Sequence, residues 1–200
     1  MLHLYTWTTP NGIKPLILLE ELGLLYEINW VDLGKDQQHD PAYLRINPNG
    51  KIPALVDDDV PIFESGAILV HLAEKTGLFL AKSGQARTDA LGWLFFQVGS
   101  IGPMFGQLGH FLHAKEKVPY ALDRYRKETE RLYGVLDERL GQVDYLAGEY
   151  GIADIATFGW ADSMARLQID PARFPHVVRW LERIRQRPAV QRARALKPDK

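Results

Sequence analysis

Polar side chains crowd the junction between an apolar run and a leucine-rich segment near the start of the chain, "YTWTTPNGIK". We expect a strand to lead into a helix here, with Thr9 and Asn11 where backbone N–H groups of the helix point outward. Helix N-termini and hydrogen-bond donors favour a thiolate over a thiol, so both side chains are candidates for stabilising a reacting sulfur. The alternative interpretation is that they only cap the helix, with Asn11 at the N-cap.

A carboxylate is followed directly by a hydroxyl at Glu64 and Ser65, before a segment with helical spacing. A helix N-terminus offers free N–H groups to a ligand carboxylate, and a neighbouring glutamate can receive the ammonium group of the same ligand. Together these groups suit the zwitterionic end of an amino acid. Ser65 as a plain N-cap is the alternative interpretation.

Pro53 opens the predicted strand "IPALV" and cannot donate a hydrogen bond to a neighbouring strand. The backbone of Ile52, just before it, is therefore available to another partner. From the residues alone, an ordinary trans proline at an edge strand is favoured over a cis bond.

The chain has no cysteine, so it cannot form a disulfide, a thiolate metal site or a thiol nucleophile of its own. Any sulfur chemistry must therefore use the sulfur of a ligand. His110 and His113 could share one helical face, but no carboxylate at matching spacing completes a metal-binding set. We expect no metal.

The composition is that of an ordinary globular protein, with 46% hydrophobic and 24% charged residues and a formal net charge of −1. This charge opposes the broad positive surface of a nucleic-acid-binding protein. The arginine-rich stretch 179–200 is the exception, and we interpret it as the solvated face and tail of a terminal helix rather than as a basic patch. No apolar run is as long as a membrane span and no basic-then-apolar leader opens the sequence, so we expect a cytoplasmic protein that binds neither nucleic acid nor membranes.

Alternating strands and helices must position the candidate residues in the first 80 residues. The patterns predict strands at 1–7 and 26–33, a helix ending at Gly23, a short helix at 41–45, a hairpin turning at 57–59, and a helix from Ser65 to Gly77. The first two strands should pair in parallel through a right-handed crossover.

From residue 88 onward the patterns are helical throughout. The predicted segments are 89–112, 119–141, 152–167 and 174–188. A linker near residues 78–87 then divides the chain into an α/β domain, residues 1–80, and an all-helical domain, residues 88–200.

The polar junction, "IPAL", "FESGAI" and a trailing helical domain, in this order and spacing, resemble the glutathione transferase family across essentially the whole chain. More narrowly, "TPNGIK", "VDLGK", "INPNGKIPALVD", "FESGAILVHLAEKTG", "WLFFQVG" and "GPMFGQ" are similar to its bacterial nu class, whose members are glutathione-dependent disulfide-bond reductases. The resemblance implies a thioredoxin-like first domain, a helical domain that lines the substrate cleft and the dimer interface, and a homodimer.

The resemblance also implies a place for each part of the tripeptide glutathione. Glu64 and Ser65 would hold its γ-glutamyl end. The backbone of Ile52, before a cis Pro53, would pair with its cysteinyl unit like an added strand. The other implied contacts are Thr9 and Asn11 at the sulfur, Lys51 and Gln38 near the glycine carboxylate or the adjoining backbone, and Arg131 reaching toward the ligand. For Arg131, simple solvation on a charged helix is the alternative.

The chain departs from the family pattern at the thiol. Many transferases activate it with a tyrosine, serine or cysteine at the end of the first strand, where this chain has Thr8, Thr9 and Asn11. Tyr5 comes earlier, inside the predicted strand, and is the fallback. A nu-class reaction fits this absence, because a second glutathione or its disulfide can supply the reacting partner.

A second departure concerns folding. In "GIADIA", Gly151 replaces the family's capping serine or threonine, although Asp154 can still accept a hydrogen bond from the Gly151 N–H.

Our leading hypothesis is a homodimeric enzyme in which bound glutathione carries out thiol–disulfide exchange, with weak conjugation of electrophiles as a side activity. Two alternatives remain open: a transferase that conjugates an apolar electrophile, and a non-catalytic glutathione-binding protein.

Overall fold

The computed structural model describes residues 1–198 of the 200-residue chain. Its residues group into two compact units. One unit contains residues 1–82 and 186–198, and the other is Ser83–Arg185. No helix within residues 1–198 combines the length and apolar character needed to cross a bilayer.

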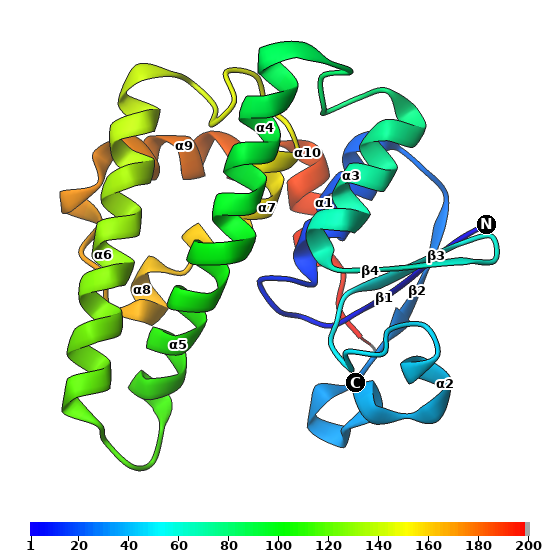
Figure 1. Cartoon of the computed structure of the whole chain (residues 1–200), viewed down its shortest axis with the longest axis horizontal. Helices are drawn as coiled ribbons and strands as arrows, with labels where there is room; N and C mark the ends of the chain where they lie inside the picture. Colours follow the sequence, from blue (N-terminus) through cyan, green and yellow to red (C-terminus); the bar gives the residue numbers. More distant parts are fainter. Residues whose placement is uncertain (199–200) are drawn as a thin grey trace. The chain divides into compact units, whose positions relative to one another are not determined.

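The first unit is built on a four-stranded sheet in the order β2-β1-β3-β4 (Figure 1). β1 (Leu2–Thr6) pairs in parallel with β2 (Tyr26–Trp30). β3 (Ala54–Asp57) pairs antiparallel with β1, and β4 (Val60–Phe63) completes the hairpin. The predicted parallel pair and hairpin are confirmed. They could be predicted because each apolar run is short and is bounded by turn residues.

Helices and short turns connect these strands. They are α1 (Ile13–Leu22), η1 (Leu33–Lys35), η2 (Gln37–His39), α2 (Pro41–Leu44) and α3 (Ser65–Thr76). Gly23 and Gly77 end α1 and α3 in the left-handed conformation, at φ 62° and 71°, as predicted. In β1, Leu4 is buried, while Tyr5 on the opposite face packs on Tyr43 of α2 at 6.0 Å between ring centroids.

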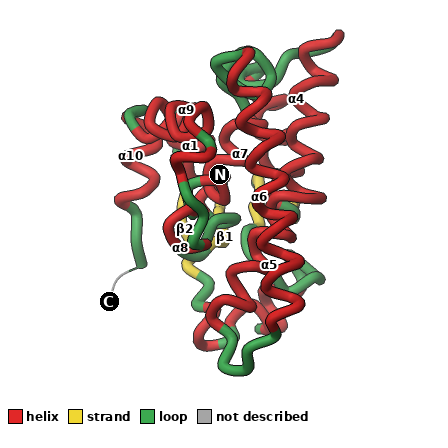
Figure 2. The backbone as a smooth tube through the Cα atoms, turned by 90° about the vertical axis from the view of Figure 1, so that its left-hand side faces the viewer, coloured by secondary structure: helices red, strands yellow, loops and turns green. Residues whose placement is uncertain are grey.

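The last helix, α10 (Pro188–Ala195), packs on α1 (Figure 2). Two arginines fasten it to the end of α1: Arg187 Nε lies 2.6 Å from Glu21 Oε1, and Arg192 Nε lies 2.6 Å from Glu20 Oε2. Residues 186–198 thus group with the first unit by compactness, although they follow the helical unit in the sequence. These arginines of the terminal stretch are held in ion pairs rather than simply solvated.

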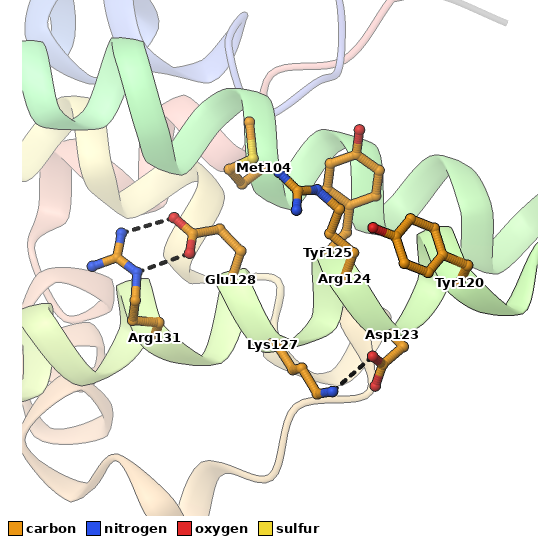
Figure 3. A pocket seen from close by; sticks show the side chains of 8 residues that line it. All are labelled: Met104, Tyr120, Asp123, Arg124, Tyr125, Lys127, Glu128 and Arg131. Atoms are coloured by element: carbon orange, nitrogen blue, oxygen red, sulfur yellow. Dashed lines mark hydrogen bonds and ion pairs between the residues drawn. The ribbon is translucent and has the colours of Figure 1, made fainter.

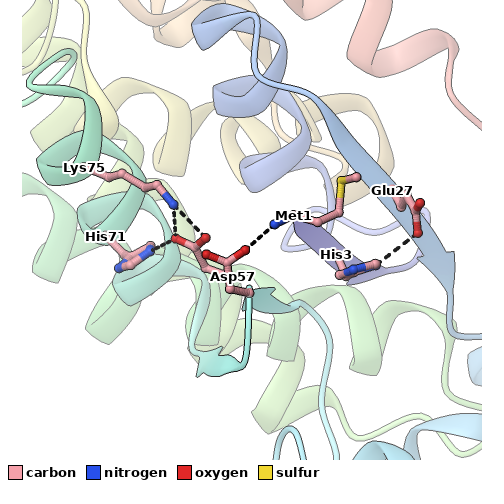
Figure 4. Close-up of polar contacts among 7 residues, drawn as sticks. Met1, His3, Glu27, Asp57, His71 and Lys75 are labelled. Carbon is pink, nitrogen blue, oxygen red and sulfur yellow. Dashed lines mark hydrogen bonds and ion pairs between the residues drawn. The ribbon is translucent and has the colours of Figure 1, made fainter.

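A polar cluster fixes the hairpin to α3 (Figure 4). The Asp57 side chain is only 8% exposed. Lys75 Nζ donates to both of its carboxylate oxygens at 2.6 Å, and His71 Nε2 lies 2.8 Å from Asp57 Oδ2. The hydrogen bond from Lys75 is the main cause that holds the pKa of Asp57 below its ordinary value. On the sheet itself, His3 Nδ1 and Glu27 Oε2 are 3.1 Å apart between β1 and β2.

The second unit is all-helical within its residues, as predicted. Its elements are α4 (Gly84–Phe96), the π-helical turn η3 (Gln97–Ile101), α5 (Gly102–His113), α6 (Pro119–Gln142), α7 (Ile152–Ala161), α8 (Met164–Leu167), η4 (Pro171–Arg173) and α9 (Pro175–Arg185). α4 and α5 form one continuous rod through η3 (Figure 1). The predicted segment 152–167 is two helices, because α7 ends at Ala161 and α8 begins at Met164.

Asp154 joins three parts of this unit. Its Oδ2 accepts from the Gly151 N–H at 3.2 Å, which confirms the predicted half of a capping box. Its Oδ1 accepts from the Leu146 N–H at 3.0 Å and from Trp180 Nε1 of α9 at 2.9 Å. Burial raises the pKa of Asp154 to about 6. The carboxyl group therefore organises the start of α7 and its packing on α9.

Candidate functional site

The register of the sheet places three loops at one end of the first unit. Ala54 at the start of β3 lies opposite Tyr5 on β1 and Phe63 on β4. Because β1 and β4 run antiparallel to β3, the chain leaves β1 and β4 at the same end at which it enters β3. These three loops carry Thr9, Asn11, Ile52, Pro53, Glu64 and Ser65. The fold thus gathers residues that are more than fifty positions apart in the sequence.

The loop after β1 is a tight turn that closes on Gly12. The Thr6 hydroxyl donates to the Gly12 carbonyl oxygen at 3.0 Å, and the Thr9 N–H donates to the Trp7 carbonyl oxygen at 2.8 Å. A Cβ atom added to Gly12 would lie 2.0 Å from the Trp7 carbonyl oxygen, so only glycine fits. The N-cap of α1 is Gly12, without a side-chain hydrogen bond, and the prediction of Asn11 at the N-cap was wrong.

Within this turn the Thr9 hydroxyl is held in a defined orientation. Its oxygen accepts a hydrogen bond from the Gly12 N–H at 3.0 Å. A hydroxyl carries one hydrogen to donate, and within residues 1–198 that of Thr9 has no acceptor. Asn11 is half-buried in the same turn, and its carbonyl oxygen accepts from the Lys14 N–H at 3.4 Å. The turn therefore presents a donor that a ligand atom can use.

The chain enters β3 through a cis peptide bond between Ile52 and Pro53, as the family resemblance implied. The preceding carbonyl oxygen, that of Lys51, accepts from Asn47 Nδ2 at 2.6 Å and from the Tyr43 hydroxyl. These two buried side chains fix the backbone just before Ile52. The Lys51 side chain itself is exposed.

Gln38 lies in η2, in the segment that follows β2. Its Nε2 donates to Asp36 Oδ1 at 3.2 Å, while its Oε1 is buried without a hydrogen-bond partner in the described part of the chain. A buried amide oxygen that lacks a donor is costly. A ligand N–H group near Gln38 would remove that cost.

The turn into α3 carries the two polar residues in different environments. Glu64 is exposed and occupies the N-cap at φ 71° and ψ 119°, a conformation unusual for a residue with a side chain. Ser65, only 7% exposed, is the first helical residue, so the prediction of Ser65 at the N-cap was wrong. The physical reason is a different partner: Lys14 Nζ of α1 lies 3.2 Å from Ser65 Oγ.

Our sequence reasoning missed Lys14 and Gly12. A lysine inside the apolar run "IKPLILL" was the available signal, because an ordinary surface lysine belongs on the polar face of a helix. For Gly12 the only signal was the "NG" pair before the helix. Neither signal says what the residue contacts.

Arg131 lies in the second unit, in a pocket of about 660 Å³ between α5 and α6 (Figure 3). The pocket is lined by Met104, Tyr120, Asp123, Arg124, Tyr125, Lys127, Glu128 and Arg131. The guanidinium of Arg131 donates to both carboxylate oxygens of Glu128, at 2.8 and 2.7 Å. These hydrogen bonds hold the pKa of Glu128 below its ordinary value. Arg131 thus has a partner on its own helix.

The two helical histidines have other contacts. His113 Nδ1 lies 2.8 Å from the Gly109 carbonyl oxygen, and the His110 ring packs edge-on against Phe111. Among residues 1–198, no group of three or more histidine, aspartate or glutamate side chains is arranged to hold a metal ion.

Both halves of the chain match models of known domains. Residues 1–74 match the N-terminal domain of glutathione S-transferase, and residues 98–188 match its C-terminal domain. The chain is 51% identical over 202 residues to the disulfide-bond oxidoreductase YfcG of Escherichia coli K12, covering 96% of this chain and 94% of YfcG. The chain belongs to the glutathione transferase family.

Solved structures of bacterial glutathione transferases agree with this fold. One from Pseudomonas putida, with one glutathione disulfide bound per subunit, is 42% identical with a TM-score of 0.94, covering 98% of this chain and 92% of that one. One from Pseudomonas fluorescens, with two glutathione bound, is 42% identical with a TM-score of 0.91, covering 96% and 91%. The thioredoxin-like and helical domains that the resemblance implied are confirmed.

In this member of the family, Tyr5 is not part of the polar turn. It lies within β1, opposite Asn29 and Ala54, with its ring against Tyr43. The nearest hydroxyl groups that follow β1 are those of Thr8 and Thr9. Only the hydroxyl of Thr9 is oriented by a hydrogen bond from the turn.

Proposed function

We propose that the protein is a glutathione-dependent disulfide-bond reductase in which Thr9 and Asn11 stabilise the thiolate of bound glutathione. The observation that carries the proposal is the Thr9 hydroxyl: its oxygen accepts from the Gly12 N–H, so its hydrogen is directed elsewhere. A hydroxyl held in this way can donate to a sulfur anion without reorienting. The name of the E. coli relative and the glutathione compounds bound to the Pseudomonas proteins support this chemistry.

The γ-glutamyl end of glutathione occupies the turn into α3. Its α-carboxylate meets the hydroxyl of Ser65 and the free N–H groups of the first turn of α3, a helix of 12 residues. Its ammonium group meets the exposed carboxylate of Glu64. The two charges of an amino-acid end are thus both matched.

The middle and the far end of the tripeptide follow the backbone toward η2. The backbone of Ile52, fixed just before the cis bond to Pro53, pairs with the cysteinyl unit. Lys51 and Gln38 lie near the glycine carboxylate or the adjoining backbone, and the buried oxygen of Gln38 receives a ligand N–H. For Arg131 the proposal rests on the family resemblance, and its guanidinium also pairs with Glu128 on its own helix.

The reaction is thiol–disulfide exchange. The glutathione thiolate attacks one sulfur of the substrate disulfide, a mixed disulfide forms, and the other sulfur leaves as a thiolate that takes up a proton. A second glutathione thiolate then attacks the glutathione sulfur of the mixed disulfide, which releases the reduced substrate and glutathione disulfide. No sulfur of the chain takes part, because it has no cysteine.

The proposed activity also implies a cellular location, an oligomeric state and a role for the helical domain. The protein acts in the cytoplasm, where reduced glutathione is the main small thiol. It forms a homodimer, which the exposed Val60 and Phe63 on β4 support. The helical domain lines the cleft for the second substrate and contributes to the dimer interface.

A substrate panel tests this function. Purified protein is assayed with reduced glutathione and either a small symmetrical disulfide or an apolar aryl halide. We expect disulfide reduction well above the uncatalysed exchange and only weak conjugation of the halide. Conjugation faster than disulfide reduction would favour an ordinary transferase, and rates at the uncatalysed level for both substrates would favour a protein that binds glutathione without catalysis.

A further inference from the structure

Lys14 is a lysine inside the core of the first unit. It is 1% exposed, in the first turn of α1, followed by buried residues from Pro15 to Leu19. Moving an ammonium group out of water is costly, so a buried lysine needs partners that keep its charge or else it loses its proton. The groups near Lys14 Nζ therefore indicate the role of this side chain.

Two groups that act on Lys14, Ser65 and Glu64, belong to the turn into α3. Its Nζ donates to Ser65 Oγ at 3.2 Å, across fifty-one positions of sequence. Burial lowers the pKa of Lys14 to about 7, and the negative charge of Glu64 acts in the opposite direction. Near neutral pH, a further negative charge beside Ser65 would favour the ammonium form.

The hydrogen bond from Lys14 also sets the direction of the Ser65 hydroxyl. Because Ser65 Oγ accepts from Lys14, its own hydrogen must point to another acceptor. The first N–H groups of α3 also lack acceptors within the helix. A carboxylate placed at the start of α3 would therefore receive the hydroxyl hydrogen and face the ammonium charge behind it.

We propose that Lys14 is a positioning residue for the α-carboxylate of the γ-glutamyl group, holding the Ser65 hydroxyl in its donating orientation and supplying the positive charge behind it. The inference rests on the proposed placement of the γ-glutamyl end at Glu64 and Ser65. It makes Lys14 a determinant of specificity, because only a ligand with that carboxylate benefits from the charge.

A purely structural lysine would behave differently. Replacing a buried charge by an apolar side chain of similar volume is often neutral or stabilising, and the exposed Glu64 stays hydrated without its partner. Lys14→Met should therefore fold, with a thermal stability equal to or above that of the wild type. A loss of ligand discrimination in a stable variant separates positioning from structure.

The test is calorimetric titration with two ligands: glutathione, and the analogue in which hydrogen replaces the α-carboxylate of its glutamyl unit. Removing a hydrogen-bond network to a charged group weakens binding by about 10- to 100-fold. We expect Lys14→Met to weaken glutathione binding by that factor and to leave the affinity for the analogue unchanged. An equal loss for both ligands, or no loss for glutathione, overturns the proposal.

Further variants sharpen the result. Ser65→Ala should weaken glutathione binding, and adding Lys14→Met to it should cost little more, because the two residues act as a unit. Fully additive losses overturn the proposal. Lys115→Met, which removes an exposed lysine of the second unit, is the matched control and should change neither affinity.

Lys14→Gln covers the case in which Lys14→Met does not fold. Its amide keeps a donor for Ser65 and removes only the charge, so its ratio of the two affinities should lie between those of the wild type and Lys14→Met. A wild-type ratio in whichever variant folds overturns the inference. If wild-type protein binds no glutathione at all, the proposed function itself fails, and the two failures are thus distinguishable.

Discussion

Tyr5 of β1 lies directly opposite Ala54 of β3 in the sheet. This pairing fixes where the polar turn after β1 stands relative to the cis bond before β3, because both segments begin within a few residues of the pair. The loop that carries Thr9 and the segment that contains Ile52 thus lie at the same end of the sheet. In the proposed function, the cysteinyl unit of glutathione pairs with the backbone of Ile52, so we expect its sulfur at the same end of the sheet as Thr9.

The hydroxyl of Thr9 should matter for turnover more than for binding. We expect Thr9→Ala to lower kcat for disulfide reduction by about 10- to 100-fold, because it removes one oriented donor to a thiolate. The KM for glutathione should change little, since the rest of the tripeptide stays bound. Steady-state kinetics measures both, and Thr8→Ala, at an exposed neighbour, is the control. A raised KM with unchanged kcat would contradict this role.

Glu64→Ala should have the reverse effect. It removes the carboxylate that we propose as the partner of the ligand's ammonium group, and it leaves the polar turn of Thr9 unchanged. We expect the KM for glutathione to rise by about tenfold or more, with kcat at saturating glutathione close to that of the wild type. The same kinetic series, extended to high glutathione, provides the measurement. Loss of kcat alone would place Glu64 in the chemical step instead.

The turn around Gly12 should tolerate no side chain. In Gly12→Ala the new Cβ meets the Trp7 carbonyl oxygen at 2.0 Å and the Thr6 hydroxyl at 2.6 Å, so the turn must open. We expect a loss of about 2 kcal/mol or more in the free energy of unfolding. Thermal and urea unfolding measure it.

A glycine in an open position is the matched control. A Cβ at Gly134, inside α6, has no neighbour within 4 Å. Gly134→Ala should therefore raise the free energy of unfolding by about 0.5–1 kcal/mol, the usual gain from alanine in a helix. A Gly12→Ala variant as stable as Gly134→Ala would contradict the tight turn at Gly12.

Local pattern was enough for most elements and insufficient for the contacts between distant ones. The strands, Gly23 and Gly77 could be predicted because periodicity and helix-ending glycines are encoded within a few residues. The place of α10 could not, because its partners Glu20 and Glu21 lie more than 160 positions away.

In the candidate site, too, the residues could be predicted from local sequence and from the resemblance, but the contacts between distant residues could not. Residue types and the family resemblance pointed to the loops that the sheet brings together, including the cis bond at Pro53. The partner of Ser65 was not predictable. The position of Lys14 within its apolar run does not indicate that its side chain contacts α3. Similarly, the orientation of the Thr9 hydroxyl depends on the Gly12 N–H, which only the folded turn provides.

Asp154 should be the main stabilising polar residue of α7. Asp154→Ala leaves three N–H donors without their acceptor, and we expect it to cost about 3 kcal/mol of unfolding free energy. Because burial raises the pKa of Asp154 from 3.8 to about 6, its contribution is fully present below pH 3.8 and declines as pH rises through about 6. The difference between wild type and variant should therefore be larger at pH 4 than at pH 7. A difference that grew with pH would contradict this.

The most direct test of thiolate stabilisation by Thr9 is the pKa of the thiol of glutathione bound to the protein. The ultraviolet absorbance of the thiolate, followed across a pH titration, measures this pKa. An ordinary thiol has a pKa of about 8.5. We expect a clearly lower pKa for glutathione on the wild-type protein, and a return toward the ordinary value in Thr9→Ala at saturating ligand. An unshifted pKa on the wild-type protein, or an equally lowered one in Thr9→Ala, would contradict thiolate stabilisation by Thr9.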